Sequence, residues 1–151
     1  MKDLRLRQVA VVGFLVVIGC ALSFAKELTL DELKARVADA SIGERPGLCV
    51  EIAERQVETA SRSYEADDIA KGQAALVDVA AFSELARDYA IQSRKREKQS
   101  EIAVRKMVRK LENLKYSVPQ EDQKKIQETI DRLQRVRDDL LAAMFPNGVK
   151  K

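Results

Sequence analysis

Three carboxylates, Glu51, Glu54 and Glu58, are the side chains of this sequence best spaced to do chemistry together. They fall at positions i, i+3 and i+7, which places them on one side of a helix. Helical carboxylate sites for iron or manganese pair Glu with a His three residues on, and the chain has no His. Arg55 and Arg62 lie among the acids. The pattern therefore favours a salt-bridged helix surface over a metal site.

The absence of His also bears on catalysis, because His is the most frequent general base near neutral pH. The sequence contains no glycine-rich phosphate loop, no nucleophile elbow and no Cys-x-x-Cys pair. We therefore expect a protein that is not an enzyme and that uses no metal or other cofactor.

A dense group of cations occupies residues 94–115, which hold nine Lys and Arg against three Asp and Glu. Residues 26–93 hold eight Lys and Arg against fourteen Asp and Glu, so the two regions carry opposite net charge. Such asymmetry steers association between molecules. The residues expected to contact an anion or a partner are Arg94, Lys95, Arg96, Lys98, Arg105, Lys106, Arg109 and Lys110.

A solvated helix surface is the simpler interpretation of the same cations. No aromatic residue alternates with them to stack on bases, so nucleic acid is not an expected ligand. Outside the cytoplasm, the anions that such a stretch would meet are lipid head groups, polysaccharides and acidic proteins.

The N-terminal segment has the order of a secretory signal. A short basic region, residues 2–7, precedes an uncharged run of 17 residues, residues 9–25. Ser23 and Ala25 supply the small residues that signal peptidase requires before a cut. This spacing predicts cleavage between Ala25 and Lys26.

Two alternatives remain for the same segment. Residues 17–20, ending in Cys20, resemble the bacterial lipobox, in which the Cys becomes the lipidated first residue. The uncharged run is also close to the length of about 20 residues that spans a bilayer, so an uncut anchor is the third interpretation. All three place the remaining chain outside the cytoplasm, in the periplasm or secreted, and the last two tether it to a membrane.

Cys49 is the cysteine that remains after a cut at Ala25, which excludes a disulfide within the mature chain. It shares a helical stripe with Ile52 and Val57, so we expect a buried thiol that packs as a small apolar group. The alternative is a disulfide between two chains.

The composition, with few aromatic residues and many good helix formers, predicts an all-α protein. Thr29 and Glu32 form a capping box that begins a short helix ending near Ala40. A second helix is expected over residues 46–66, and Asp68 is placed to cap the next one.

Residues 73–118 contain neither Gly nor Pro, which predicts one long central helix. Two antiparallel hairpins, residues 46–92 and 100–145, would share this helix in an elongated or coiled-coil-like bundle. Because residues 92–101 contain no apolar side chain, the alternative is a chain that turns there and folds back as a compact bundle.

The expected organisation is a signal segment over residues 1–25, a helical domain over 26–145 and a tail over 146–151. The leading functional expectation is an exported, non-enzymatic interaction or scaffold protein of the cell envelope or extracellular space, whose partner is another protein or a second copy. The alternative is binding of anionic lipid head groups or polysaccharide through residues 94–115. An enzyme of unknown type ranks third.

Overall fold

The computed structural model describes residues 27–148. Five helices account for most of this part, which contains no strand: α1 (Leu30–Asp39), α2 (Arg45–Glu65), α3 (Ile69–Ser93), α4 (Glu97–Ser117) and α5 (Gln120–Met144). The predicted all-α class is confirmed. The expectations for Cys20, Ala25 and Lys26 concern the N-terminal segment, which lies outside the described residues.

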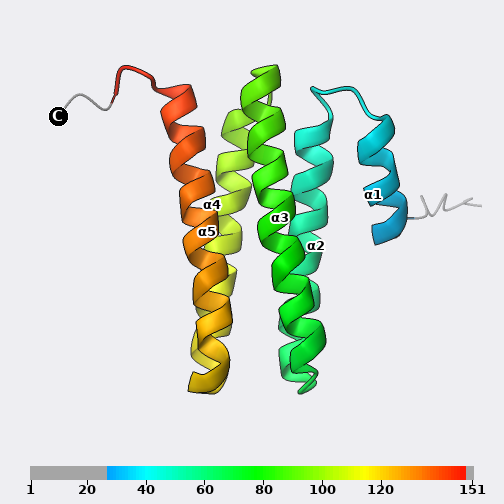
Figure 1. The fold of residues 1–151 in the computed structure, drawn as a ribbon, viewed down its shortest axis with the longest axis vertical. Coiled ribbons are helices and arrows are strands. Elements are labelled where there is room, and N and C mark those ends of the chain that lie inside the picture. Colours follow the sequence, from blue (N-terminus) through cyan, green and yellow to red (C-terminus); the bar gives the residue numbers. More distant parts are fainter. Residues whose placement is uncertain (1–26, 149–151) are drawn as a thin grey trace, which may run out of the picture.

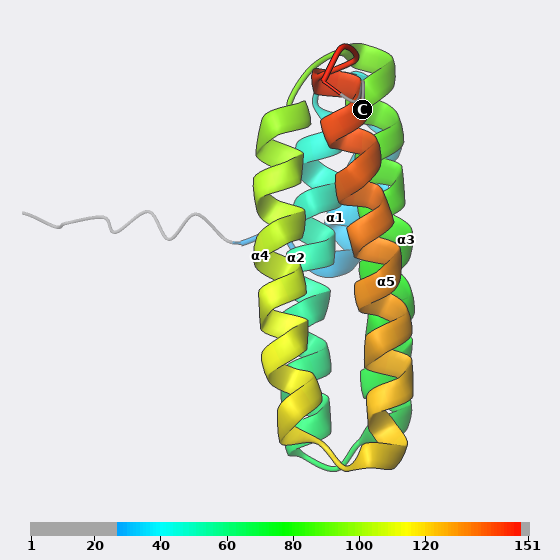
Figure 2. The ribbon, with the colours of Figure 1, turned by 90° about the vertical axis from the view of Figure 1, so that its left-hand side faces the viewer.

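Helices α2 to α5 form a four-helix bundle made of two antiparallel hairpins (Figure 1). The first hairpin is α2 with α3, and the second is α4 with α5. The hairpins pack side by side, with α2 against α4 and α3 against α5, as the rotated view shows (Figure 2). Because α3 and α4 lie diagonally across the bundle, their outer sides look in opposite directions.

The prediction of one continuous helix over residues 73–118 is wrong, and the alternative, in which the chain folds back, is correct. Helix α3 ends at Ser93 and α4 begins at Glu97. In the turn between them, Arg94 and Arg96 adopt left-handed backbone conformations, with φ of 53° and 62°. The turn reverses the chain and brings α4 and α5 back alongside α2 and α3.

Packing explains why the turn forms without Gly or Asn. A left-handed residue other than Gly costs about 1–2 kcal/mol, whereas burying one large apolar side chain contributes about 1.5–3 kcal/mol. Folding back buries an apolar seam from the second hairpin against the first. Fully buried side chains of this seam are Val104, Met107, Leu111, Ile126, Ile130, Leu133 and Leu140. The free energy gained by burying this seam therefore exceeds the conformational cost at Arg94 and Arg96.

The predicted helix starts are confirmed at two positions. Thr29 Oγ1 accepts a hydrogen bond from the Glu32 amide at 3.2 Å, and the Glu32 carboxylate accepts one from the Thr29 amide at 2.7 Å. This reciprocal pair is the capping box of α1. The Asp68 carboxylate accepts from the Lys71 amide at 3.2 Å and caps α3.

Helix α1 lies against the first hairpin over a second, smaller core. Leu33 and Val37 of α1 pack with Cys49, Ile52 and Ala86. The ammonium of Lys34 in α1 also donates to the Asp78 carboxylate of α3 at 2.8 Å. In the described part of the chain, no helix is both long and apolar enough to span a bilayer.

Candidate interaction surfaces

The cations predicted as contact residues are all exposed, but the fold divides them between two places. Arg94, Lys95 and Arg96 lie in the turn between α3 and α4, at one end of the bundle. The others follow α4: Lys98, Arg105, Lys106, Arg109 and Lys110.

Some of these cations are engaged within the protein. Lys110 donates to Glu58 of α2 and so joins the two hairpins. Arg105 lies 3.8 Å from the buried carboxylate of Glu101. No ion pair within residues 27–148 includes Lys98, Lys106 or Arg109. The same is true of Arg94, Lys95 and Arg96 in the turn, so Lys98, Lys106 and Arg109 are the cations of α4, within the predicted set, that remain available to a ligand.

The available cations share one side of α4 with two exposed apolar residues. Ile102 is 40% exposed and Tyr116 is 79% exposed. The spacing of Lys98, Ile102 and Arg109 follows the helix period of 3.6 residues, so they lie in one row. We name this surface the α4 face, and it consists of Lys98, Ile102, Arg105, Lys106, Arg109 and Tyr116.

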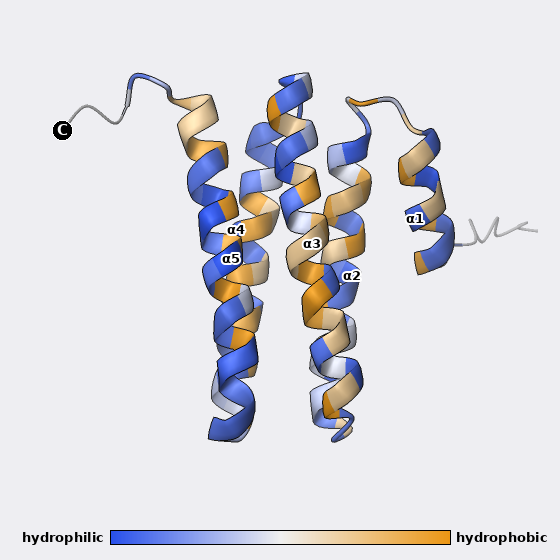
Figure 3. Ribbon diagram, viewed as in Figure 1, coloured by the Kyte–Doolittle hydropathy of each residue, from blue (hydrophilic) through white to orange (hydrophobic). Residues whose placement is uncertain are grey.

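Helix α3 presents a different surface on the opposite side of the bundle. Its outward positions over four turns are apolar, and we name them the α3 face: Ala70, Ala74, Val77, Ala81 and Leu85. Val77 is 50% exposed and Leu85 is 37% exposed. Figure 3 shows apolar positions along the middle and lower part of α3, whereas α5 is predominantly hydrophilic. Sequence reasoning missed this surface, although α3 is apolar around most of its circumference, a pattern that predicts contacts on every side.

A polar cleft of about 520 Å³ lies at the end of the bundle near the turn between α3 and α4. It is lined by both charge signs, including Arg36 and Arg96 against Asp39, Glu44 and Glu51. The pKa of Glu44 is lowered because its carboxylate accepts hydrogen bonds from the side chain and backbone of Ser41. This carboxylate thus closes the turn that precedes α2.

Two glycines lie against side chains of the turn between α3 and α4: Gly47 against Arg96, which lines the cleft, and Gly43 against Lys95. A Cβ atom at Gly47 would come 3.1 Å from Arg96 Nη1, and one at Gly43 would come 2.8 Å from Cδ of Lys95. The sequence signal for these contacts is the pair of glycines on either side of the start of α2.

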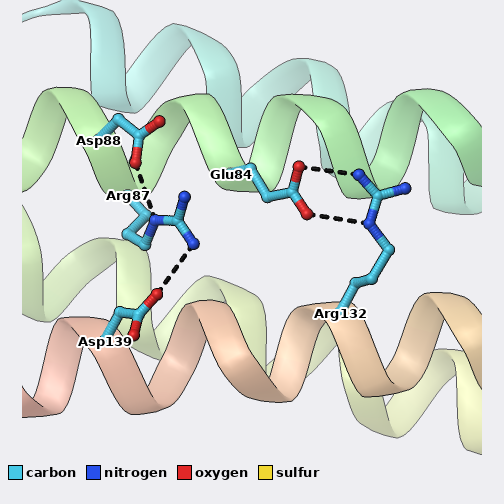
Figure 4. A network of polar contacts seen from close by, with 5 residues as sticks. All are labelled: Glu84, Arg87, Asp88, Arg132 and Asp139. Carbon is cyan, nitrogen blue, oxygen red and sulfur yellow. Dashed lines mark hydrogen bonds and ion pairs between the residues drawn. The ribbon is translucent and has the colours of Figure 1, made fainter.

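Several other charged side chains join neighbouring helices. Arg132 of α5 makes two parallel hydrogen bonds, of 2.9 and 2.8 Å, to the Glu84 carboxylate of α3 (Figure 4). Arg87 of α3 bonds both its neighbour Asp88 at 2.8 Å and Asp139 of α5 at 2.9 Å (Figure 4). These pairs fix the register of α3 against α5.

The carboxylates of α2 take part in the same kind of interaction. Glu51 accepts from Arg55 at 2.7 Å, and Glu58 accepts from Lys110. The interpretation of Glu51, Glu54 and Glu58 as part of a salt-bridged surface is confirmed for Glu51 and Glu58. Within the described residues, no group of His, Cys, Asp and Glu is arranged to hold a metal ion.

Cys49 is fully buried under α1, as the stripe it shares with Ile52 predicts. Burial raises the pKa of the Cys49 thiol to about 11. At neutral pH the group is therefore a thiol, which is a far weaker nucleophile than the thiolate. A disulfide between two chains through Cys49 is incompatible with this packing.

Comparison of the chain with protein-family models, with curated proteins and with solved structures finds no match.

Proposed function

We propose that this chain is a non-enzymatic helical interaction protein that is exported and works in the cell envelope or the extracellular space. The observation that carries the proposal is the pair of outward surfaces on opposite sides of one bundle, the apolar α3 face and the cationic α4 face. A rigid body with two such surfaces can hold two different partners at once, which is what a scaffold does. The sequence of the N-terminal segment supports export.

The end cleft does not favour catalysis. Its lining holds two guanidinium groups and three carboxylates, and Glu44 is committed to closing the turn before α2. The residues that line the cleft include no Ser or Cys, and the pKa of the Glu44 carboxyl is lowered by its hydrogen bonds from Ser41. General acid catalysis near pH 7 needs the opposite shift, a carboxyl pKa raised toward the working pH.

A second candidate function is binding to an anionic lipid surface through the α4 face. Two observations favour it: Lys98, Lys106 and Arg109 are available, and Ile102 and Tyr116 are exposed among them. Lys and Arg near an anionic membrane contribute about 1 kcal/mol each, and apolar and aromatic side chains enter the interface beside them.

The α4 face is tested by charge substitution and sedimentation with vesicles of equimolar phosphatidylcholine and phosphatidylglycerol. We expect the double variant Lys106→Gln and Arg109→Gln to bind about ten- to thirty-fold more weakly, because two contributions of about 1 kcal/mol are lost. Binding of the unchanged protein should fall steeply as salt rises, because salt screens the attraction.

The matched control is Lys124→Gln with Arg135→Gln, which removes the same charges from exposed positions on α5. It should bind as the unchanged protein does. Equal losses from both double variants would show that net charge alone matters and would refute a role for the α4 face. Competition by a soluble anionic polysaccharide, with no binding to vesicles, would assign the surface to polysaccharide instead.

A further inference from the structure

The turn between α3 and α4 is a strained segment. Of the three residues other than Gly that have a positive φ in the described chain, Asp67 is of a type that tolerates it, and the other two, Arg94 and Arg96, lie in this turn. Arg94 takes the left-handed position after a helix that Gly usually occupies, while the Lys95 amide donates back to the Ala90 carbonyl at 3.3 Å. The turn therefore holds two arginines in a conformation that their residue type disfavours.

The side chains of this turn do little to hold it closed. Residues 94–96 are exposed, and no ion pair within residues 27–148 includes any of them. Lys and Arg are good helix formers, so a right-handed helix is the conformation that these residues favour. The packing of one hairpin on the other is thus what keeps the turn closed. An arrangement that keeps this packing and opens the turn relieves the strain.

The packing between the hairpins does not require both of them to belong to one chain. Helix α2 makes its most extensive contact with α3, and α4 with α5, so each hairpin is a unit. The two units are joined by the apolar seam and by ion pairs such as Glu58 with Lys110 and Glu84 with Arg132. The α4–α5 hairpin of a second copy carries the same side chains and can make every one of these contacts. The occupant that fits the first hairpin is therefore already defined by the fold.

The position of the turn permits such an exchange. The turn lies at one end of the bundle (Figure 2), so opening it leads α4 and α5 away from their own first hairpin and beyond that end. A second copy that faces this end about a two-fold axis can receive the hairpin and return its own. Short connections under strain favour exchange of an element between copies over closure within one chain.

We propose that two copies of this chain form a dimer by exchanging their α4–α5 hairpins, with residues 94–96 of each copy helical instead of turned. Each half of the dimer is then a four-helix bundle built from both chains, and it carries one α3 face and one α4 face. The proposal goes beyond the proposed function and does not depend on export or on lipid binding. The two can therefore fail separately.

Refolding from urea tests the exchange, because the hairpins separate only when the seam between them opens. The protein is refolded at the highest accessible concentration and in high salt, which screens the cations of the two turns from each other. We expect a monomer and a dimer that size-exclusion chromatography separates. A protein that yields only monomer under these conditions overturns the proposal.

Cross-linking distinguishes an exchanged dimer from two bundles that touch. Glu58→Cys and Lys110→Cys place a thiol on either side of the α2 and α4 seam, where both side chains are about half exposed. The two variants are mixed in urea, refolded together and treated with a short bismaleimide; where Cys20 is retained, it is changed to Ser. In the exchanged dimer these positions meet between different chains, so we expect a covalent heterodimer on a denaturing gel. Cys49 does not compete, because it is fully buried and protonated.

Two outcomes of the cross-linking overturn the proposal. Copies that associate through an outer surface keep each seam within one chain, so a dimer without this cross-link is not an exchanged one. Equal cross-linking of the two variants mixed without urea would show contact between outer surfaces instead.

Substitutions in the turn test its conformation. Arg94→Gly with Arg96→Gly should raise the dissociation constant of the dimer at least about 100-fold, because Gly relaxes the closed turn and disfavours the helix of the exchanged form. The constant is measured from the monomer and dimer fractions after refolding over a series of concentrations. Both residues are exposed, so the variant should keep the folded circular dichroism spectrum of the unchanged protein.

Arg94→Ala with Arg96→Ala is the matched control. It removes the same two charges, but Ala keeps both the strain of the left-handed conformation and the preference for helix. Its dimer should therefore persist. Equal losses from the Gly and Ala variants would show that the charge of the turn, and not its conformation, governs association, which would overturn the proposal.

Discussion

Leu76→Ala is expected to lower the free energy of unfolding by about 3 kcal/mol, whereas Val77→Ala should change it by less than about 0.5 kcal/mol. The two residues are adjacent in α3, but Leu76 is fully buried in the main core and Val77 is 50% exposed. Truncating Leu76 loses its burial and leaves a cavity among well-packed side chains. Truncating Val77 removes only part of an exposed surface.

Urea denaturation of both variants measures this contrast. The sequence alone does not rank the two positions, because α3 is apolar around most of its circumference. If Val77→Ala costs as much as Leu76→Ala, then α3 is rotated about its axis and the α3 face does not exist as described.

Arg137→Met is expected to lower the free energy of unfolding by about 1–3 kcal/mol. The Glu101 side chain is only 8% exposed, and it accepts from Arg137 Nε at 2.8 Å across the α4 and α5 seam. Removing the guanidinium leaves a buried carboxylate whose remaining cation is Arg105 at 3.8 Å. Because the Arg137 side chain is 40% exposed, we expect less than the full cost of breaking a buried ion pair.

The double variant Glu101→Met with Arg137→Met should recover most of this loss, because it leaves no buried charge. Arg132→Met is the control: Arg132 also pairs with a carboxylate, but its partner Glu84 is 33% exposed, so this loss should stay at or below about 1 kcal/mol. A double variant as unstable as Arg137→Met would show that packing of the Arg137 stem, and not the charge of Glu101, sets the cost.

The starts of α1 and α3 and many of the core positions were predictable because they depend on local rules. The capping box at Thr29 and the cap at Asp68 consist of hydrogen bonds between residues three positions apart in the sequence. Apolar residues recur at helical spacing in residues 104–114 and 126–140, and this spacing identifies the sides of α4 and α5 that are buried.

The break between α3 and α4 was not predictable from local signals. Residues 94–96 are all cations with good helix propensity, and neither Gly nor Pro marks the turn. The turn exists because long-range packing of the second hairpin on the first outweighs the local cost at Arg94 and Arg96.

The candidate surfaces were predictable only in part. The density of cations in residues 94–115 is visible in the sequence, but their availability is not. Lys110 is held by Glu58, a residue 52 positions away, so its engagement depends on the tertiary fold. The α3 face depends on which side of an apolar helix the other four helices leave uncovered.

Intact mass of the protein recovered from cytoplasmic, membrane and external fractions tests the central claim, export of an interaction domain, most directly. We expect a chain that begins at Lys26 and lies outside the cytoplasm. A chain that begins at a lipidated Cys20, or an intact chain in the membrane fraction, would be consistent with export. Either result would show that the chain is not cleaved after Ala25. An intact chain beginning at Met1 and found only in the cytoplasm would contradict the proposed function.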